Sequence, residues 1–179
     1  ILNNKNESLS TISLKRLTLI RAARSQNRDV KNEACAEIIK ILQNNAANLD
    51  TRINIIKCTL QGLIVKQNRV TAKNNVKIIS PILIQYIKQR LERMQNPEQY
   101  EDFEDGEDLS DITKLLICVL ASECTELMKK LNLHQHADIF TPENLTKDNN
   151  LLLKAVLRCH CPELTKKLNL HQHEDIFKE

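Results

Sequence analysis

The last third of the sequence contains the same segment twice. Residues 115–140 read LLICVLASECTELMKKLNLHQHADIF and residues 152–177 read LLKAVLRCHCPELTKKLNLHQHEDIF, so 18 of 26 positions are identical at a constant offset of 37 residues. Each copy has an apolar run, a break at Cys124-Thr125 or Cys161-Pro162, a short amphipathic piece and the tail NLHQHxDIF. A unit of this size cannot bury its own apolar face, so the duplication predicts units that stack on one another.

The low glycine content narrows the fold class. The chain has 179 residues, of which 41% are hydrophobic, and this is enough for a continuous core. Only two glycines and four prolines interrupt it. β-Sandwiches, β-barrels and nucleotide-binding folds need more glycine at tight turns and close approaches, so the composition predicts an all-α protein.

Cysteine usage and apolar runs bear on the compartment. Four of the six cysteines fall among apolar residues of predicted helices, which favours free thiols in a reducing compartment. The longest apolar run, residues 115–121, is shorter than the ~18–20 residues of a membrane span, and no signal-peptide pattern is visible. We expect an intracellular protein, cytoplasmic or nuclear, without membrane contact. Because the sequence begins with Ile1, we expect it to be a piece of a longer protein.

Apolar residues at helical spacing predict four amphipathic helices in the first half. Ser80-Pro81 falls inside the fourth, and proline removes a helical hydrogen-bond donor, so we expect a kink near Ile78 or two shorter helices. Short connections favour antiparallel neighbours. The predicted helices are residues 10–24, a second that begins at Asp29, a third capped by Asp50 and a fourth capped by Thr71.

Charge divides the chain unevenly. Residues 1–96 hold 17 Lys and Arg against 6 Asp and Glu, whereas residues 97–179 hold 9 against 17. Eight of those acids lie between Glu98 and Asp111, where no base occurs, and this predicts an acidic loop. The expected organisation is a basic four-helix segment (1–96), an acidic loop or linker (97–110) and the tandem repeat pair (111–179).

Further helix boundaries are predicted around the duplicated copies. Ser110 is the expected cap of the helix that carries the first apolar run, which is apolar on every side and should be deeply buried. Thr141-Pro142-Glu143 combines a cap, a proline at the first helical position and an acid in the first turn. Asp148 or Asn149 should restart the second copy, with Leu152, Leu153 and Val156 as its core face.

Alternating amphipathic helices, short connections and a period of about 40 residues resemble the HEAT and armadillo class of α-solenoid over most of the chain. A shorter stretch, Pro162–Leu168 with His171–Ile176, is similar to the second helix and following turn of an ankyrin repeat. The period of 37 differs from the ankyrin period of about 33, and the TPLH-type helix start is absent. The resemblance implies stacked antiparallel helix pairs that bind other proteins; a plain helical bundle is the remaining alternative.

The histidine pairs are a candidate metal site. His134-x-His136 and His171-x-His173 each follow a cysteine by ten residues, and thiolate and imidazole are ligands that zinc prefers. The spacing matches neither a CxxC knuckle nor an HxxxH helical pair. We therefore predict a polar turn whose imidazoles cap a helix end, without a metal or other cofactor. No GxSxG, P-loop or dinucleotide motif occurs, so we expect no enzymatic activity.

The expected function is protein–protein interaction, as a scaffold or adaptor that holds a partner helix or extended peptide along a groove between repeats. The alternative is nucleic-acid or polyanion binding through the basic N-terminal helices, although such bases can equally be a solvated outer face. The acidic loop could fold back on these helices and compete with an acidic ligand. The candidate partner-binding residues are Arg21, Arg24, Arg28, Lys31, Lys73, Lys77, Leu133, Leu170, Ile176 and Phe177.

Overall fold

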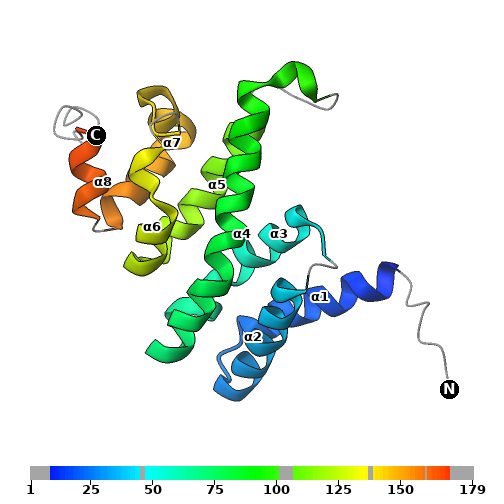
Figure 1. The fold of residues 1–179 in the computed structure, drawn as a ribbon. Helices are drawn as coiled ribbons and strands as arrows, with labels where there is room; N and C mark the ends of the chain where they lie inside the picture. The colour runs from blue at the N-terminus through cyan, green and yellow to red at the C-terminus, as the bar shows by residue number, and fades with distance from the viewer. Residues whose placement is uncertain (1–8, 45–46, 101–106, 137–138, 160, 170–179) are drawn as a thin grey trace. The chain divides into compact units, whose positions relative to one another are not determined.

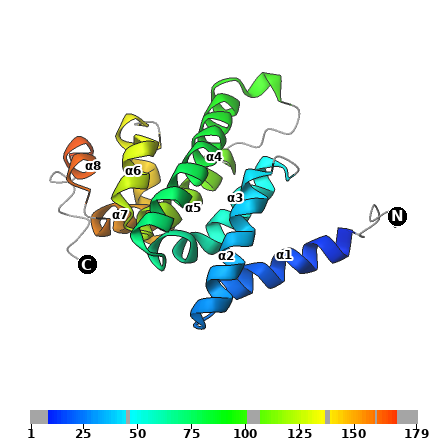
Figure 2. The same ribbon diagram turned by 60° about the horizontal axis from the view of Figure 1, so that its bottom comes forward.

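A computed structural model describes residues 9–44, 47–100, 107–136, 139–159 and 161–169. Every regular element in these ranges is a helix and none is a strand, as Figures 1 and 2 show from two directions. The predicted all-α class is therefore confirmed. The elements are α1 (Leu9–Ala23), α2 (Arg28–Gln43), α3 (Leu49–Leu60), the π-helical turn η1 (Gln61–Val65), α4 (Arg69–Gln95), the 3₁₀ turn η2 (Pro97–Gln99), α5 (Glu107–Ala121), α6 (Thr125–Leu131), the 3₁₀ turn η3 (Leu133–Gln135), α7 (Pro142–Arg158) and α8 (Pro162–Lys167).

Residue contacts divide the chain into two compact units, Ile1–Ile79 and Ser80–Glu179. The first unit contains α1 to η1 and the beginning of α4, and the second contains the rest of α4 and everything after it. This boundary falls inside α4, whereas the charge pattern predicts a division at 97–110. Packing and charge are different properties, and the predicted three-part organisation stays a prediction.

Asparagine residues cap three helices that begin in the first unit, α2, α3 and α4. The Asn27 side chain accepts hydrogen bonds from the backbone amides of Asp29 and Val30, at 3.0 and 3.2 Å. Asn48 caps α3 and Asn68 caps α4 in the same way, each through an amide three residues further on, at 2.8 and 2.9 Å. The predicted caps Asp50 and Thr71 are therefore wrong by two to three residues, because an asparagine upstream satisfies the free amides of each first turn.

Gly62 lets two elements of the first unit approach closely. It lies in η1 and is buried, and a Cβ atom added to it would stand 2.7 Å from the backbone oxygen of Ala23, the last residue of α1. Any larger residue there would force the two backbones apart. Both Ile56 and Leu63 nearby in the sequence are fully buried, so this crossing forms part of the core of the first unit.

The longest helix, α4, runs through Pro81 without interruption. The alternative of two shorter helices meeting at Pro81 is therefore wrong, and the kink near Ile78 stays a prediction. Proline removes one backbone hydrogen bond, but the apolar side chains on both sides of it, including Ile79 and Leu83, are completely buried and hold the helix together. Among the described residues, neither α4 nor any other helix combines the length and apolar character needed to cross a membrane.

Replacing Pro81 with alanine is expected to raise the free energy of unfolding by about 1–2 kcal/mol. This is less than the roughly 3 kcal/mol that proline costs in a regular helix interior, because the existing helix already accommodates the ring. The Pro81 side chain is exposed, so the change leaves no cavity. Urea denaturation followed by circular dichroism measures the change, with Gln85→Ala, exposed one turn later, as control. Equal or lower stability of the Pro81 variant than of wild type would contradict the expectation.

The second unit is built around α5. It contacts both α6 and α7, and α8 contacts α7 and η3. Leu115, Leu116, Val119 and Leu120 are fully buried in α5, as the apolar run predicts. Burial on every side is not observed, because Ala121 is exposed at the end of the helix.

The two copies have the same local structure where both are described. Cys124 and Cys161 precede their helices with similar backbone angles, φ −80°, ψ 95° and φ −98°, ψ 94°, so the predicted breaks are confirmed. Asn132 and Asn169 follow the second helix of each copy, and both have φ 47°, a left-handed conformation that asparagine tolerates. The two copies therefore share the backbone conformation of these positions as well as their sequence.

The connection between the copies also follows the prediction. The Thr141 side chain accepts a hydrogen bond from the amide of Asn144 at 3.2 Å, so Thr141 caps α7. Residues 147–150 leave helical geometry, and positive φ values from Asp148 to Asn150 mark the expected restart. Leu152, Leu153 and Val156 are buried after it, as predicted.

The acidic segment is shorter than predicted at its C-terminal end. α5 begins at Glu107, so Ser110 lies inside the helix and does not cap it. The reason is Asp108, whose side chain is only 3% exposed and meets Arg90 of α4, Oδ1 to Nη1, at 2.6 Å. A buried ion pair of this kind holds residues 107–110 in the second unit rather than in solvent.

Further contacts surround this ion pair, and we name Tyr86, Arg90, Arg93, Asp108 and Asp111 the α4–α5 charge cluster. Arg90 Nη2 lies 3.7 Å from Asp111 Oδ2, and the Arg90 guanidinium stands 5.0 Å from the centre of the Tyr86 ring. Arg93 Nε lies 3.3 Å from Asp108 Oδ2, but these atoms are not aligned for a hydrogen bond, so the contact is charge attraction. Arg90 and Arg93 therefore stabilise the contact between α4 and α5 and do not form an exposed basic surface.

Candidate functional site

An open groove lies in the first unit between α2 and the beginning of α4, and we name it the α2–α4 groove. Its volume is about 380 Å³, which is within the range of sites for small ligands. It combines amide and hydroxyl side chains with small or apolar ones. Its lining residues are Asn32, Cys35, Ala36, Ile39, Gln67, Asn68, Thr71 and Asn75.

Helical spacing explains why these residues share one cavity. The four lining residues of α2 are spaced i, i+3, i+4 and i+7, and this spacing places them along one face of the helix. On the opposite wall, Asn68, Thr71 and Asn75 follow the same period from the cap of α4. The groove is therefore lined by one face of α2, by the start of α4 and by Gln67 in the connection between η1 and α4.

Two amides of the groove are held by the backbone. Gln67 Nε2 donates to the Gly62 oxygen at 2.8 Å, and Asn75 Nδ2 donates to the Leu63 oxygen at 2.7 Å. Asn75 is 6% exposed, so its orientation is set by this bond and by packing. Both carbonyls belong to η1, where the wider helical turn changes the hydrogen-bond pattern. The groove thus has polar groups in defined positions before any ligand binds.

Cys35 is the buried thiol of the groove. Burial raises the pKa of the Cys35 thiol above its ordinary value, while the charge of Lys31 and a hydrogen bond with Gln67 oppose this shift. The thiolate is the nucleophilic form, so a raised pKa keeps Cys35 protonated and unreactive at neutral pH. The side chains that line the groove can therefore form hydrogen bonds and apolar contacts with a ligand, and both favour binding.

The predicted basic site residues lie partly beside the groove. Arg21, Arg24 and Arg28 are exposed around the connection between α1 and α2. Lys31 is half-buried, and its Nζ donates to the backbone oxygen of Lys66 at 3.3 Å. This contact brings the first turn of α2 against the end of η1, so Arg28 and Lys31 flank one end of the α2–α4 groove without lining it.

Lys73 and Lys77 lie elsewhere on the surface of the first unit. Both are exposed on α4, one turn apart. A helix turns by about 100° per residue, so both positions are on the side of α4 opposite Asn68 and Asn75. The structure therefore does not place them with Arg28 and Lys31 in the groove.

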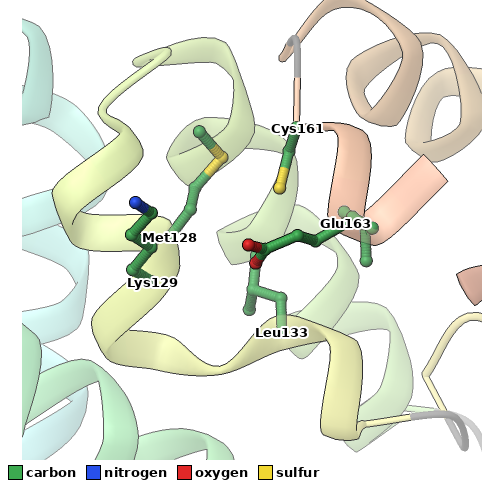
Figure 3. A pocket seen from close by; sticks show the side chains of 6 residues that line it. Met128, Lys129, Leu133, Cys161 and Glu163 are labelled. Carbon is green, nitrogen blue, oxygen red and sulfur yellow. The ribbon is translucent and has the colours of Figure 1, made fainter. Parts of the chain in front are cut away.

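The predicted apolar contact residues give no open surface in the described part of the chain. Leu133 is 3% exposed, because it packs between the two copies beside a cavity of about 20 Å³, large enough for about one water molecule. Figure 3 shows Cys161 and Glu163 extending toward Met128 and Leu133 around this cavity. Leu170, Ile176 and Phe177 lie outside the described residues.

The histidine turn is described only in the first copy. Residues 133–135 form η3, and the backbone amide of His136 donates to the Leu133 oxygen at 3.1 Å. Within the ranges that the structure describes, no group of three or more His, Cys, Asp or Glu residues could hold a metal ion. His171 and His173 lie outside those ranges, so the predicted metal-free polar turn stays a prediction.

Sequence reasoning missed the groove. Asn68, Thr71 and Asn75 at helical spacing are a visible signal, since asparagine is uncommon on a packed helix face. These residues face α2 only because η1 and the close approach at Gly62 position the start of α4. No pattern in the sequence predicts that approach.

Fold and site together define an all-α protein with a tandem helical unit and a polar groove between helices. Comparisons with protein-family models, with characterised proteins and with solved structures find no match. The function must therefore be argued from the residues themselves.

Proposed function

We propose that the protein is a non-enzymatic binding module that holds a peptide segment of a protein partner in the α2–α4 groove. The observation that carries this proposal is an open groove of about 380 Å³ whose amide side chains are already oriented by η1. Side-chain amides both donate and accept hydrogen bonds, and a peptide backbone needs both. Preorganised groups lower the entropy cost of binding.

We further propose that the duplicated units stack in the same order as in a HEAT-like array. Two contacts support this arrangement: α5, which carries the start of the first copy, contacts α7, which carries the start of the second, and η3 of the first copy contacts α8 of the second.

A substitution that fills the groove tests the binding proposal. Ala36 is exposed on the groove face of α2, so Ala36→Trp occupies the groove without entering the core. The matched control is Glu37→Trp, the next residue, on the opposite side of the same helix. Peptides selected from a random displayed library on the full chain should bind the Ala36 variant at least about tenfold more weakly than wild type. The control variant should bind them as wild type does. Equal binding to the Ala36 variant and wild type would overturn the proposal.

Polyanion binding is the second candidate, since Arg21, Arg24 and Arg28 are exposed near one another in the sequence. Its affinity should fall steeply with salt concentration and should not change in the Ala36→Trp variant. The affinity of a peptide that binds in the groove should instead fall in the Ala36→Trp variant.

A further inference from the structure

We infer that the α2–α4 groove binds an extended acidic peptide, with a carboxylate side chain of the peptide at the end formed by Arg28, Lys31 and Lys66. This inference rests on the proposed function and names the class of ligand. Size, charge and hydrogen-bonding groups of the groove support it separately.

The length of the groove fits a short extended chain. The groove holds about 380 Å³ of open space between its lining side chains. Its α2 wall from Asn32 to Ile39 is about 10 Å long, at 1.5 Å per residue, and this length matches about three residues of extended peptide.

Charge selects an acidic ligand. Residues 1–79 carry 14 Lys and Arg against 5 Asp and Glu. Arg28 is exposed one turn before Asn32 on the same face of α2, and Lys31 and Lys66 meet at the same end. Because opposite charges near a binding site steer and retain a ligand, this end favours a carboxylate.

The acids of α2 do not cancel these bases. Glu37 is on the opposite side of the helix from the groove and pairs with Lys40 at 2.6 Å. Asp29 and Glu33 are exposed on the same part of α2 and, like Arg28, Lys31 and Lys66, they flank the groove without lining it. Three bases, Arg28, Lys31 and Lys66, stand against these two acids, so the local charge at this end of the groove is positive.

The neutral side chains of the groove suit a peptide backbone better than a nucleic acid. Asn32 and Asn68 are exposed on facing walls, and the Asn68 oxygen already accepts from the Thr71 amide, which leaves the NH₂ group of Asn68 directed to other acceptors. No aromatic ring lines the groove, whereas single-stranded nucleic acids bind by stacking of bases on aromatic rings.

The test uses labelled peptides selected on the full chain, each paired with a version in which every Glu and Asp is replaced by Gln and Asn. Fluorescence anisotropy at low salt should show that the acidic versions bind about tenfold more tightly than the neutral ones. Arg28→Ala combined with Lys66→Ala should bring this ratio close to one. Lys73→Ala with Lys77→Ala, which removes two bases from the far side of α4, should leave the ratio as in wild type.

The outcomes separate this inference from the proposed function. Equal binding of acidic and neutral peptides, both lost in Ala36→Trp, would overturn the acidic preference and leave the groove as the binding site. An acidic preference that depends on Lys73 and Lys77 as much as on Arg28 and Lys66 would also overturn the inference, because it would be a property of overall charge. Peptide binding that persists in Ala36→Trp would overturn both.

Discussion

Replacing Asp108 with alanine is expected to lower the free energy of unfolding by about 3–5 kcal/mol, the typical cost of removing one partner from a buried ion pair. The Asp108 side chain is 3% exposed and lies 2.6 Å from Arg90 and 3.3 Å from Arg93. Without it, the Arg90 guanidinium, which is 12% exposed, keeps its charge but loses its closest counter-charge. Urea denaturation of the full chain, followed by circular dichroism, measures the loss.

Two further variants show whether the charge cluster is the cause. Glu107→Ala removes a neighbouring acid whose side chain is exposed, and it should change stability by less than about 0.5 kcal/mol. Arg90→Met together with Asp108→Leu removes both charges and should recover most of the stability, because apolar residues of similar size can replace a buried ion pair. A loss below about 1 kcal/mol in Asp108→Ala would contradict a structural role for the cluster.

Gly62→Ala is expected to lower the free energy of unfolding by about 2–3 kcal/mol. The new Cβ would stand 2.7 Å from the backbone oxygen of Ala23, and a backbone atom cannot move aside as a flexible side chain can. Alanine is otherwise the better helix former by about 1 kcal/mol, so a net loss would show that the close approach of η1 to α1 dominates.

The same variant connects the fold with the groove. Gln67 and Asn75 bond to carbonyls of η1, so a displaced η1 should also weaken peptide binding. Val65→Ala, at a side chain that is 50% exposed in the same turn, serves as the control for stability and binding. A Gly62 variant as stable as wild type would show that α1 and η1 do not approach as closely as described.

Local signals in the sequence predicted much of the fold. The positions of the helices and the breaks at Cys124 and Cys161 follow from apolar period and from the duplication. Two caps were wrong because several polar residues near each helix start could accept the same hydrogen bonds. The alternative of two separate helices at Pro81 was wrong because burial on both sides of a proline outweighs one missing hydrogen bond.

Long-range features were harder to predict. Asp108 reads as one of eight acids in a solvated segment, and nothing local marks it as the partner of Arg90, 18 residues earlier. Likewise, Arg28 and Lys31 were predicted as partner-binding residues from charge alone. Their position at the end of a groove depends on η1 and on the packing of α2, which a pattern within one helix does not contain.

The most direct test of the groove as the binding site is nuclear magnetic resonance of the ¹⁵N-labelled full chain, titrated with a selected acidic peptide. If the peptide lies in the α2–α4 groove, the side-chain amide signals of Asn32, Asn68 and Asn75 should shift together, at one affinity, and signals of α1 residues before Arg21 should stay in place. Shifts confined to the arginines of the α1–α2 connection or to the second unit, with these three amides unchanged, would contradict the account.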